Sequence, residues 1–106
     1  MSFSIHDIVR ITGGQLVQEG DACTIERLLI DSRKLTYAMD GLFFAIRGER
    51  NDGHNYINDA YAAGVRNFIV EQQPISSVPE ANILVVRNSI KALQQVAAAH
   101  RKKHDI

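Results

Sequence analysis

The chain has 106 residues, a length that suits one domain built around one hydrophobic core. Hydrophobic residues make up 45% of the sequence and charged residues 23%, a composition typical of globular rather than disordered chains. Twelve basic and twelve acidic residues give a formal net charge of zero. A general nucleic-acid binder is therefore disfavoured, because no net positive field attracts a phosphate backbone.

The apolar runs are too short for a membrane span. The longest, at 28–30 and 83–86, fall far below the roughly 20 residues that cross a bilayer, and the N-terminus does not have the pattern of a signal sequence. The single cysteine, Cys23, has no Cys or His at metal-ligand spacing and is interpreted as a small packing side chain. We expect a cytoplasmic protein without membrane insertion.

The first third of the chain predicts a capped helix followed by two strands. Ser4 precedes an apolar stripe at helical spacing, and Asp7 stands at the capping-box position. The helix should end at Gly13, because glycine adopts the left-handed conformation without strain. A strand through Leu16 and Val17 follows, and the β-branched and aliphatic stretch 24–30 predicts another strand.

The middle of the chain predicts a strand, helix, strand unit. The uninterrupted apolar run 42–46 is typical of a strand covered on both faces. Ile57 and Ala60 belong to a helical repeat that Gly64 should end, and 67–71 predicts the next strand. Such a unit places its two strands parallel.

The last third predicts a strand at 82–86 and a final helix, capped by Asn88 or Ser89. One face of this helix is expected to carry Ile90, Leu93, Ala97 and His100. The whole pattern indicates an α/β fold: a single small domain with a mixed β-sheet and packed helices.

Polar residues follow two neighbouring predicted strands, and ligands of α/β sheets bind beyond the carboxyl ends of strands. The first tip is Asp31-Ser32-Arg33 and the second spans 47–54. Gly48 and Gly53 would let the backbone approach a ligand, and Arg47 or Arg50 would add positive charge, which suits a diphosphate. Simpler interpretations stay open: a glycine-bounded turn, a local Asp-Ser cap, or an ion pair between Asp31 and Arg33.

The common catalytic templates are absent. The sequence contains no ATP-binding G-x-x-x-x-G-K-[ST] loop, no G-x-G-x-x-G, no G-x-S-x-G and no H-E-x-x-H. The four histidines, His6, His54, His100 and His104, lack metal-ligand spacing. We therefore expect no catalytic residue and no metal site in this chain.

Several ordered motifs together resemble the N-terminal domain of the Mur ligases. They are Asp31-Ser32-Arg33-Lys34, the stretch 41–54 and Ala63-Gly64-Val65, within a likeness that runs over 5–106. The resemblance implies that 1–106 binds the UDP moiety of UDP-N-acetylmuramoyl-tripeptide for peptidoglycan synthesis. It also implies that ATP and Mg²⁺ act in a central domain beyond Ile106, so that this domain needs no cofactor and is inactive alone as an ATP-dependent ligase.

The resemblance also assigns site residues. Residues expected to face the uracil and ribose are Ile30 and Ser32. Residues expected to line the diphosphate are Gly48, Glu49, Arg50 and Asn51. Residues that fit the motif and are expected mainly to shape the loops are Asp31, Arg33, Asp52 and His54. One departure from the family pattern is Ala38-Met39-Asp40, where a proline-containing turn is usual.

Within the family, Arg47-Gly48-Glu49-Arg50 is most similar to the MurF type, which adds D-alanyl-D-alanine, and MurE is the near alternative. Gly64-Val65-Arg66-Asn67-Phe68 is also similar to MurF-like ligases fused ahead of an alanine racemase. A third hypothesis is that the chain is a non-enzymatic interaction module. Such a module would not bind uridine nucleotides.

Overall fold

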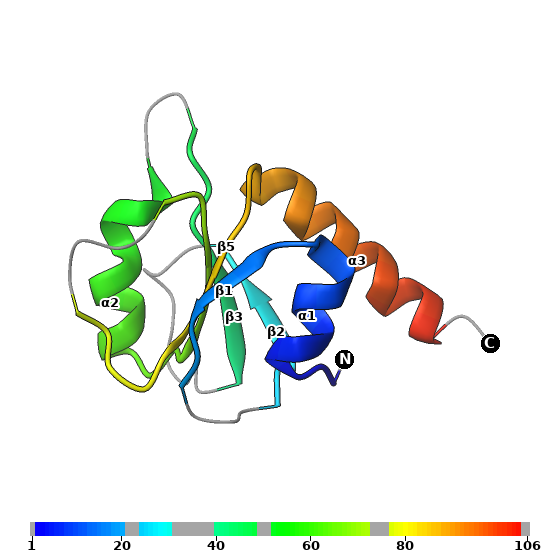
Figure 1. Ribbon diagram of the computed structural model, residues 1–106, viewed down its shortest axis with the longest axis horizontal. Helices are drawn as coiled ribbons and strands as arrows, with labels where there is room; N and C mark the ends of the chain where they lie inside the picture. The colour runs from blue at the N-terminus through cyan, green and yellow to red at the C-terminus, as the bar shows by residue number, and fades with distance from the viewer. Residues whose placement is uncertain (1, 21–23, 31–39, 49–51, 73–76, 105–106) are drawn as a thin grey trace.

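The computed structural model describes residues 2–20, 24–30, 40–48, 52–72 and 77–104. Within these residues the chain forms one five-stranded sheet with helices packed against it (Figure 1). In chain order the elements are α1 (Ile5–Thr12), β1 (Gln15–Gln18), β2 (Arg27–Leu29), β3 (Gly41–Phe44), the 3₁₀ helix η2 (Gly53–Tyr56), α2 (Ile57–Ala62), β4 (Asn67–Val70), β5 (Asn82–Val85) and α3 (Ser89–His104).

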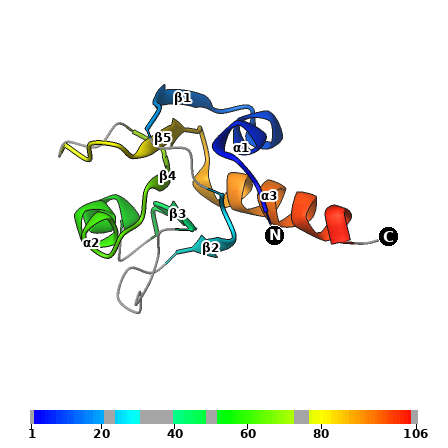
Figure 2. The ribbon, with the colours of Figure 1, turned by 90° about the horizontal axis from the view of Figure 1, so that it is seen from below.

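The sheet is mixed, as the sequence predicts. Its strand order is β1-β5-β4-β3-β2, with β2 to β5 parallel and β1 antiparallel to β5. Helices α1 and α3 cover one face, and α2 covers the other (Figure 2). We call the end at which the parallel strands begin the amino edge, and the end at which they finish the carboxyl edge.

The core lies on both faces of the central strands because their side chains alternate in direction. In β3, Leu42 and Phe44 belong to the cluster beneath α1 and α3, whereas Phe43 belongs to the cluster beneath α2. Phe43 meets Phe68 of β4 edge to face, with ring centroids 6.1 Å apart. All residues of β3 are buried, which confirms the prediction of a strand covered on both faces.

Helix α1 begins and ends where the sequence predicts. The hydroxyl of Ser4 accepts a hydrogen bond from the backbone N–H of Asp7, and the Asp7 carboxylate accepts one from the N–H of Ser4. This reciprocal capping box satisfies N–H groups that a helix start otherwise leaves unpaired. Gly13 ends the helix with a φ of 70°, the left-handed conformation that glycine adopts without strain.

The amino edge is closed by a buried asparagine pair. Asn82, the first residue of β5, donates from Nδ2 to Oδ1 of Asn67, the first residue of β4, at 2.9 Å. Its own Oδ1 accepts from the backbone N–H of Gly20 at 2.7 Å. Both side chains are almost fully buried, so these hydrogen bonds replace those that water would make.

The second strand is shorter than predicted. Only Arg27–Leu29 pairs with β3, whereas Ile25 forms an isolated antiparallel bridge with Phe3. Two backbone hydrogen bonds, of 2.7 and 3.0 Å, hold this bridge, and Ile25 is buried against the α1 side of the sheet. The predicted strand 24–30 therefore pairs with two different segments. Ile25 pairs with the N-terminal segment at Phe3, and Arg27–Leu29 pairs with β3.

Helix α3 is capped by Asn88, whose Oδ1 accepts from the N–H of Lys91 at 3.0 Å. Its buried stripe contains Ala92 and Val96, whereas Ile90 is 47% exposed. Of the four residues predicted to share one face of this helix, Leu93 packs against the core cluster beneath α1 and α3. Small side chains pack here against a cluster that includes the larger strand residues Leu42, Phe44 and Ile69.

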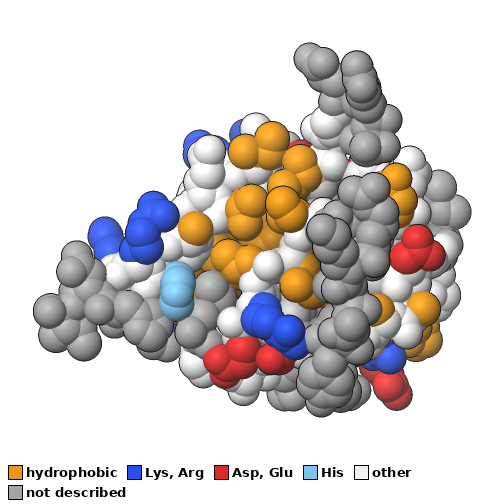
Figure 3. Space-filling view, turned by 180° about the vertical axis from the view of Figure 1, so that it is seen from behind, with side chains coloured by type: hydrophobic (Ala, Val, Ile, Leu, Met, Phe, Trp, Pro, Cys, Tyr) orange, Lys and Arg blue, Asp and Glu red, His pale blue; other side chains and the backbone are white. Residues whose placement is uncertain are grey.

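Hydrophobic side chains gather in one area of the surface seen in Figure 3, beside residues that are not described. Among the described residues, the large hydrophobic side chains with the greatest exposure are Ile30 and Ile90.

In the described part of the chain, no helix combines the length and the apolar character needed to cross a membrane.

Candidate binding site at the carboxyl edge

The ends of β2 and β3 lie side by side at the carboxyl edge. The two strands are parallel neighbours, with Leu29 opposite Phe43. Ile30 follows β2 with its side chain 60% exposed, and the exposed Gly48 follows β3. Of the predicted site, the structure therefore brings together the two strand tips. The predicted residues outside the described ranges are Ser32, Arg33, Glu49, Arg50 and Asn51.

The two ends of the stretch 48–51 are held against each other. Arg47 and Asp52 form an antiparallel bridge, and Nε of Arg47 lies 3.4 Å from Oδ2 of Asp52. The backbone N–H of Gly53 donates to the carbonyl of Ile46 at 2.8 Å. The described segments on either side of this stretch rise together from the sheet in Figure 1. We call the stretch 48–51 the β3 loop.

Gly53 is needed for packing within the protein. A Cβ atom at this position would lie 2.6 Å from the backbone nitrogen of Ile46 and 2.9 Å from Cα of Ala45. Real Cβ atoms do not approach backbone atoms so closely. The end of β3 therefore accounts for a glycine at this position without a ligand, and the interpretation that Gly53 lets the backbone approach a ligand stays a prediction.

His54 is buried beside the β3 loop and uses both ring nitrogens within the protein. Its side chain is 6% exposed, and Nδ1 lies 2.6 Å from Oδ1 of Asp52. Nε2 accepts a hydrogen bond from the backbone N–H of Glu71 at 2.9 Å. A backbone N–H can only donate, so Nε2 must be unprotonated, and the neutral ring carries its proton on Nδ1.

The pair of Asp52 and His54 has the orientation of a carboxylate that supports a general base. The nitrogen that would take a proton from a substrate is Nε2, and it is already occupied by the N–H of Glu71. This arrangement suits a fixed structural contact, and it gives the pair no place in proton transfer.

The carboxylate of Asp52 is stabilised in its ionised form. Burial by itself raises the pKa of Asp52, but hydrogen bonds from the backbone and the ring of His54, together with the positive charges of a protonated His54 and of Arg47, outweigh it. The pKa of Asp52 is thereby held below its ordinary value of 3.8. The carboxylate is therefore charged at neutral pH, and it offsets the positive charge of Arg47.

Glu71 extends the same edge to β4 and α3. It follows the last residue of β4, and its Oε2 accepts from the backbone N–H of Ser89 at 2.9 Å. A carboxylate is favourable at a helix N-terminus, where unpaired N–H groups and the helix dipole are positive. The sequence pattern predicted Glu71 as the last residue of a strand over 67–71 and did not predict this contact. The available signal was a charged residue directly after an apolar strand, as at the other two tips.

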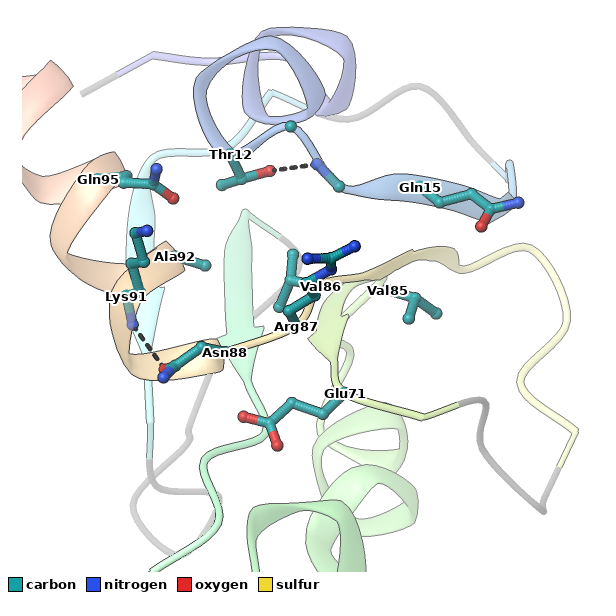
Figure 4. A pocket seen from close by; sticks show the side chains of 12 residues that line it. Thr12, Gln15, Glu71, Val85, Val86, Arg87, Asn88, Lys91, Ala92 and Gln95 are labelled. Atoms are coloured by element: carbon teal, nitrogen blue, oxygen red, sulfur yellow. Dashed lines mark hydrogen bonds between the residues drawn. The ribbon is translucent and has the colours of Figure 1, made fainter.

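A cavity of about 480 Å³ opens beside Glu71, between the end of α1 and the start of α3 (Figure 4). Its polar side chains include Gln15, Glu71, Arg87, Asn88 and Lys91. The carboxyl edge is therefore hollowed next to the ends of β4 and β5. Within the described ranges, no three His, Cys, Asp or Glu side chains gather in a way that could hold a metal ion.

The sequence matches the family model described as "Mur ligase family, catalytic domain" over residues 24–103. Two similar curated proteins are ligases of different types. UDP-N-acetylmuramoyl-tripeptide--D-alanyl-D-alanine ligase of Haemophilus influenzae is 36% identical over 80 residues, which are 74% of this chain and 16% of that protein. UDP-N-acetylmuramoyl-L-alanyl-D-glutamate--2,6-diaminopimelate ligase of Halalkalibacterium halodurans is 36% identical over 85 residues, which are 80% of this chain and 16% of that protein.

The structure is similar to solved MurF structures. A crystal structure of MurF from Acinetobacter baumannii superposes with a TM-score of 0.81 and 30% sequence identity, over 97% of this chain and 22% of that one. MurF from Thermotoga maritima, solved in complex with ADP, superposes with a TM-score of 0.62 and 26% identity, over 74% of this chain and 17% of that one. The chain thus spans about a fifth or less of these ligases. The resemblance seen in the sequence and the small α/β fold are both confirmed.

Proposed function

Because the chain belongs to the Mur ligase family, we propose that it is the substrate-recognition domain of an ATP-dependent ligase of peptidoglycan synthesis. In this proposal it holds the UDP moiety of UDP-N-acetylmuramoyl-tripeptide. The observation that carries the proposal is the pair of strand tips: β2 and β3 end side by side, and Arg47 and Asp52 close the base of the β3 loop. A site at the carboxyl ends of adjacent parallel strands suits a nucleotide.

The two tips are proposed to bind different parts of the ligand. Ile30 offers an exposed apolar side chain beside the base, and Ser32 a hydroxyl for the uracil or ribose. Gly48 to Asn51 would surround the diphosphate. Because Asp52 already offsets the charge of Arg47, Arg50 is proposed to supply the positive charge that the diphosphate needs.

The chemical step is proposed to take place outside this chain. Two observations support a domain that binds without catalysing. The sequence lacks the common catalytic templates, and His54 uses both ring nitrogens for contacts within the protein. ATP and Mg²⁺ are therefore assigned to the remainder of a longer protein. The T. maritima MurF solved with ADP supports nucleotide binding within such a ligase.

Among family members, we favour the MurF type, because the A. baumannii MurF structure superposes over nearly the whole chain. A MurE-type ligase is the second candidate, since the H. halodurans relative has the same identity as the H. influenzae one. Acceptor use by the full-length enzyme separates the two types. A MurF-type enzyme consumes ATP with D-alanyl-D-alanine, and a MurE-type enzyme of the H. halodurans kind consumes it with diaminopimelate.

The proposed site is tested by titrating the isotope-labelled chain with UDP-N-acetylmuramic acid and with UDP. Backbone amide shifts should cluster at 30–33 and 47–54. The variant R50A should weaken binding about tenfold, because it removes a charge-assisted contact to phosphate. R101A is the matched control, because Arg101 is an exposed arginine near the end of α3.

Two results would contradict the proposal. Equal binding by R50A and the parent chain would reject the assigned site. Indifference of the chain to every uridine nucleotide, at ligand concentrations of the order of millimolar, would favour the interaction module instead.

A further inference from the structure

We propose that His54 is a positioning residue, which fixes the base of the β3 loop to β4 and, through Glu71, to the start of α3. The consequence for binding rests on the proposed function, because it requires that the β3 loop bind the diphosphate. The consequence for the protein alone, a fixed connection between these three segments, does not.

Among the described residues, the hydrogen bonds and ion pairs at the base of the loop are local apart from those of His54. The bridge between Arg47 and Asp52 and the hydrogen bond from Gly53 to Ile46 join the two sides of the loop to each other and to the end of β3. Arg47 is 52% exposed, so solvent weakens its ion pair with Asp52. These contacts close the loop, but they do not tie it to the neighbouring strand.

His54 supplies that tie. Its Nδ1 lies 2.6 Å from Asp52 at the loop base, and its Nε2 accepts from the N–H of Glu71, seventeen residues further along the chain. The ring is almost fully buried, so water competes poorly for either contact. Asp52 accepts a second hydrogen bond from the backbone N–H of His54, at 3.0 Å, and is thereby held from both sides.

Glu71 connects the ring of His54 to the start of α3. Its backbone N–H holds the ring of His54, while its carboxylate accepts from the N–H of Ser89 in the first turn of α3. The charged or titratable groups facing this connection are Arg47 and Asp52 beside η2, and the carboxylate of Glu71 after β4. The loop base, β4 and α3 are thus joined by one chain of hydrogen bonds across the carboxyl edge.

Two substitutions separate the local contact from the long-range one. In H54N the side-chain amide can still donate to Asp52, but it is too short to accept from Glu71. In H54Q the longer side chain places its carbonyl oxygen near the position of Nε2, where it can accept from Glu71. Each variant therefore keeps one of the two hydrogen bonds, and a role limited to general stability predicts similar behaviour for both.

UDP affinity and thermal stability are measured for the two variants beside the parent chain. We expect H54N to weaken UDP binding about tenfold, because the partly buried N–H of Glu71 is left unpaired and the loop base is released. H54Q should bind within about threefold of the parent. Equal affinity of the two variants, whether equally reduced or unchanged, would overturn the proposal.

Amide hydrogen exchange gives a readout that needs no ligand. H54N should speed the exchange of the amides of Gly53 and Glu71 about tenfold or more, and H54Q should not. If the parent chain does not bind UDP, the proposed function fails while this exchange pattern still decides the positioning role. Matching exchange rates in both variants would overturn it.

Should H54N fail to fold, the parent chain itself provides the test. Nitrogen chemical shifts of isotope-labelled histidine report which ring nitrogen carries the proton. In the neutral ring of His54, the proton should be on Nδ1. A proton on Nε2 would be incompatible with the hydrogen bond from Glu71, and it would refute the proposed connection.

Discussion

Hydrogen bonds close both edges of the sheet, but the groups that form them differ. At the amino edge, neutral amides of Asn67 and Asn82 pair with each other and with backbone groups in full burial. At the carboxyl edge, the ionisable side chains of Asp52, His54 and Glu71 connect the end of β3, the end of β4 and the start of α3. The buried asparagine pair carries no charge, so its hydrogen bonds do not depend on an ionisation state. The hydrogen bonds at the carboxyl edge involve groups that can change charge, and they lie beside a cavity.

The largest effect on stability is expected at the amino edge. N82A leaves the N–H of Gly20 and the Oδ1 of Asn67 without their partner, and it also opens a small cavity. The free energy of unfolding, measured with urea, should fall by about 2–4 kcal/mol. UDP affinity of the folded protein should not change.

N55A is the matched control for N82A, since Asn55 is an exposed asparagine. It should change the free energy of unfolding by less than about 0.5 kcal/mol. A loss as small as this in N82A would mean that the buried pair does not stabilise the amino edge.

A smaller and pH-dependent effect is expected at the carboxyl edge. The folded pKa of Asp52 lies below its ordinary value, so ionised Asp52 stabilises the fold fully above that ordinary value. The contribution disappears as the pH falls through the lower folded pKa. Between about pH 5 and pH 2, the parent chain should therefore lose more unfolding free energy than D52N. Parallel losses would show that Asp52 is not held in its ionised form.

The smallest stability effects are expected from two exposed ion pairs, one at each edge. Arg27 lies 2.8 Å from Asp40 at the amino edge, and Arg47 lies 3.4 Å from Asp52 at the carboxyl edge. R27A and R47A should each cost less than about 1 kcal/mol of unfolding free energy, because solvent screens both pairs. Calorimetric titration with UDP should separate them: R47A should bind about threefold more weakly and R27A like the parent. The same affinity for both variants would mean that Arg47 does not support the loop.

Local signals predicted much of the fold. The capping box of Ser4 and Asp7 and the stop at Gly13 depend on neighbouring residues, and the structure confirms both. The apolar run of β3 correctly indicated a strand buried on both faces. The tips after β2 and β3 could be paired in advance because consecutive parallel strands tend to be neighbours.

Features that depend on distant partners could not be predicted in this way. Nothing near Ile25 shows that it pairs with Phe3 rather than with β3. The close packing of Gly53 against the backbone of Ile46 is formed only in the fold, so the sequence pattern could not indicate it. The contact between His54 and Glu71 likewise joins two elements whose relative position the sequence pattern does not determine.

The pairing of β1 with β5 has a consequence for how the chain folds. Gln15 lies opposite Val85, so the outermost strand β1 pairs with a strand that lies far from it in the sequence. Closing so long a loop costs entropy before its contacts are gained, and topologies rich in such contacts fold slowly. During synthesis, β1 leaves the ribosome well before its partner exists. It must therefore wait, with Leu16 uncovered, until β5 has emerged and the sheet can close.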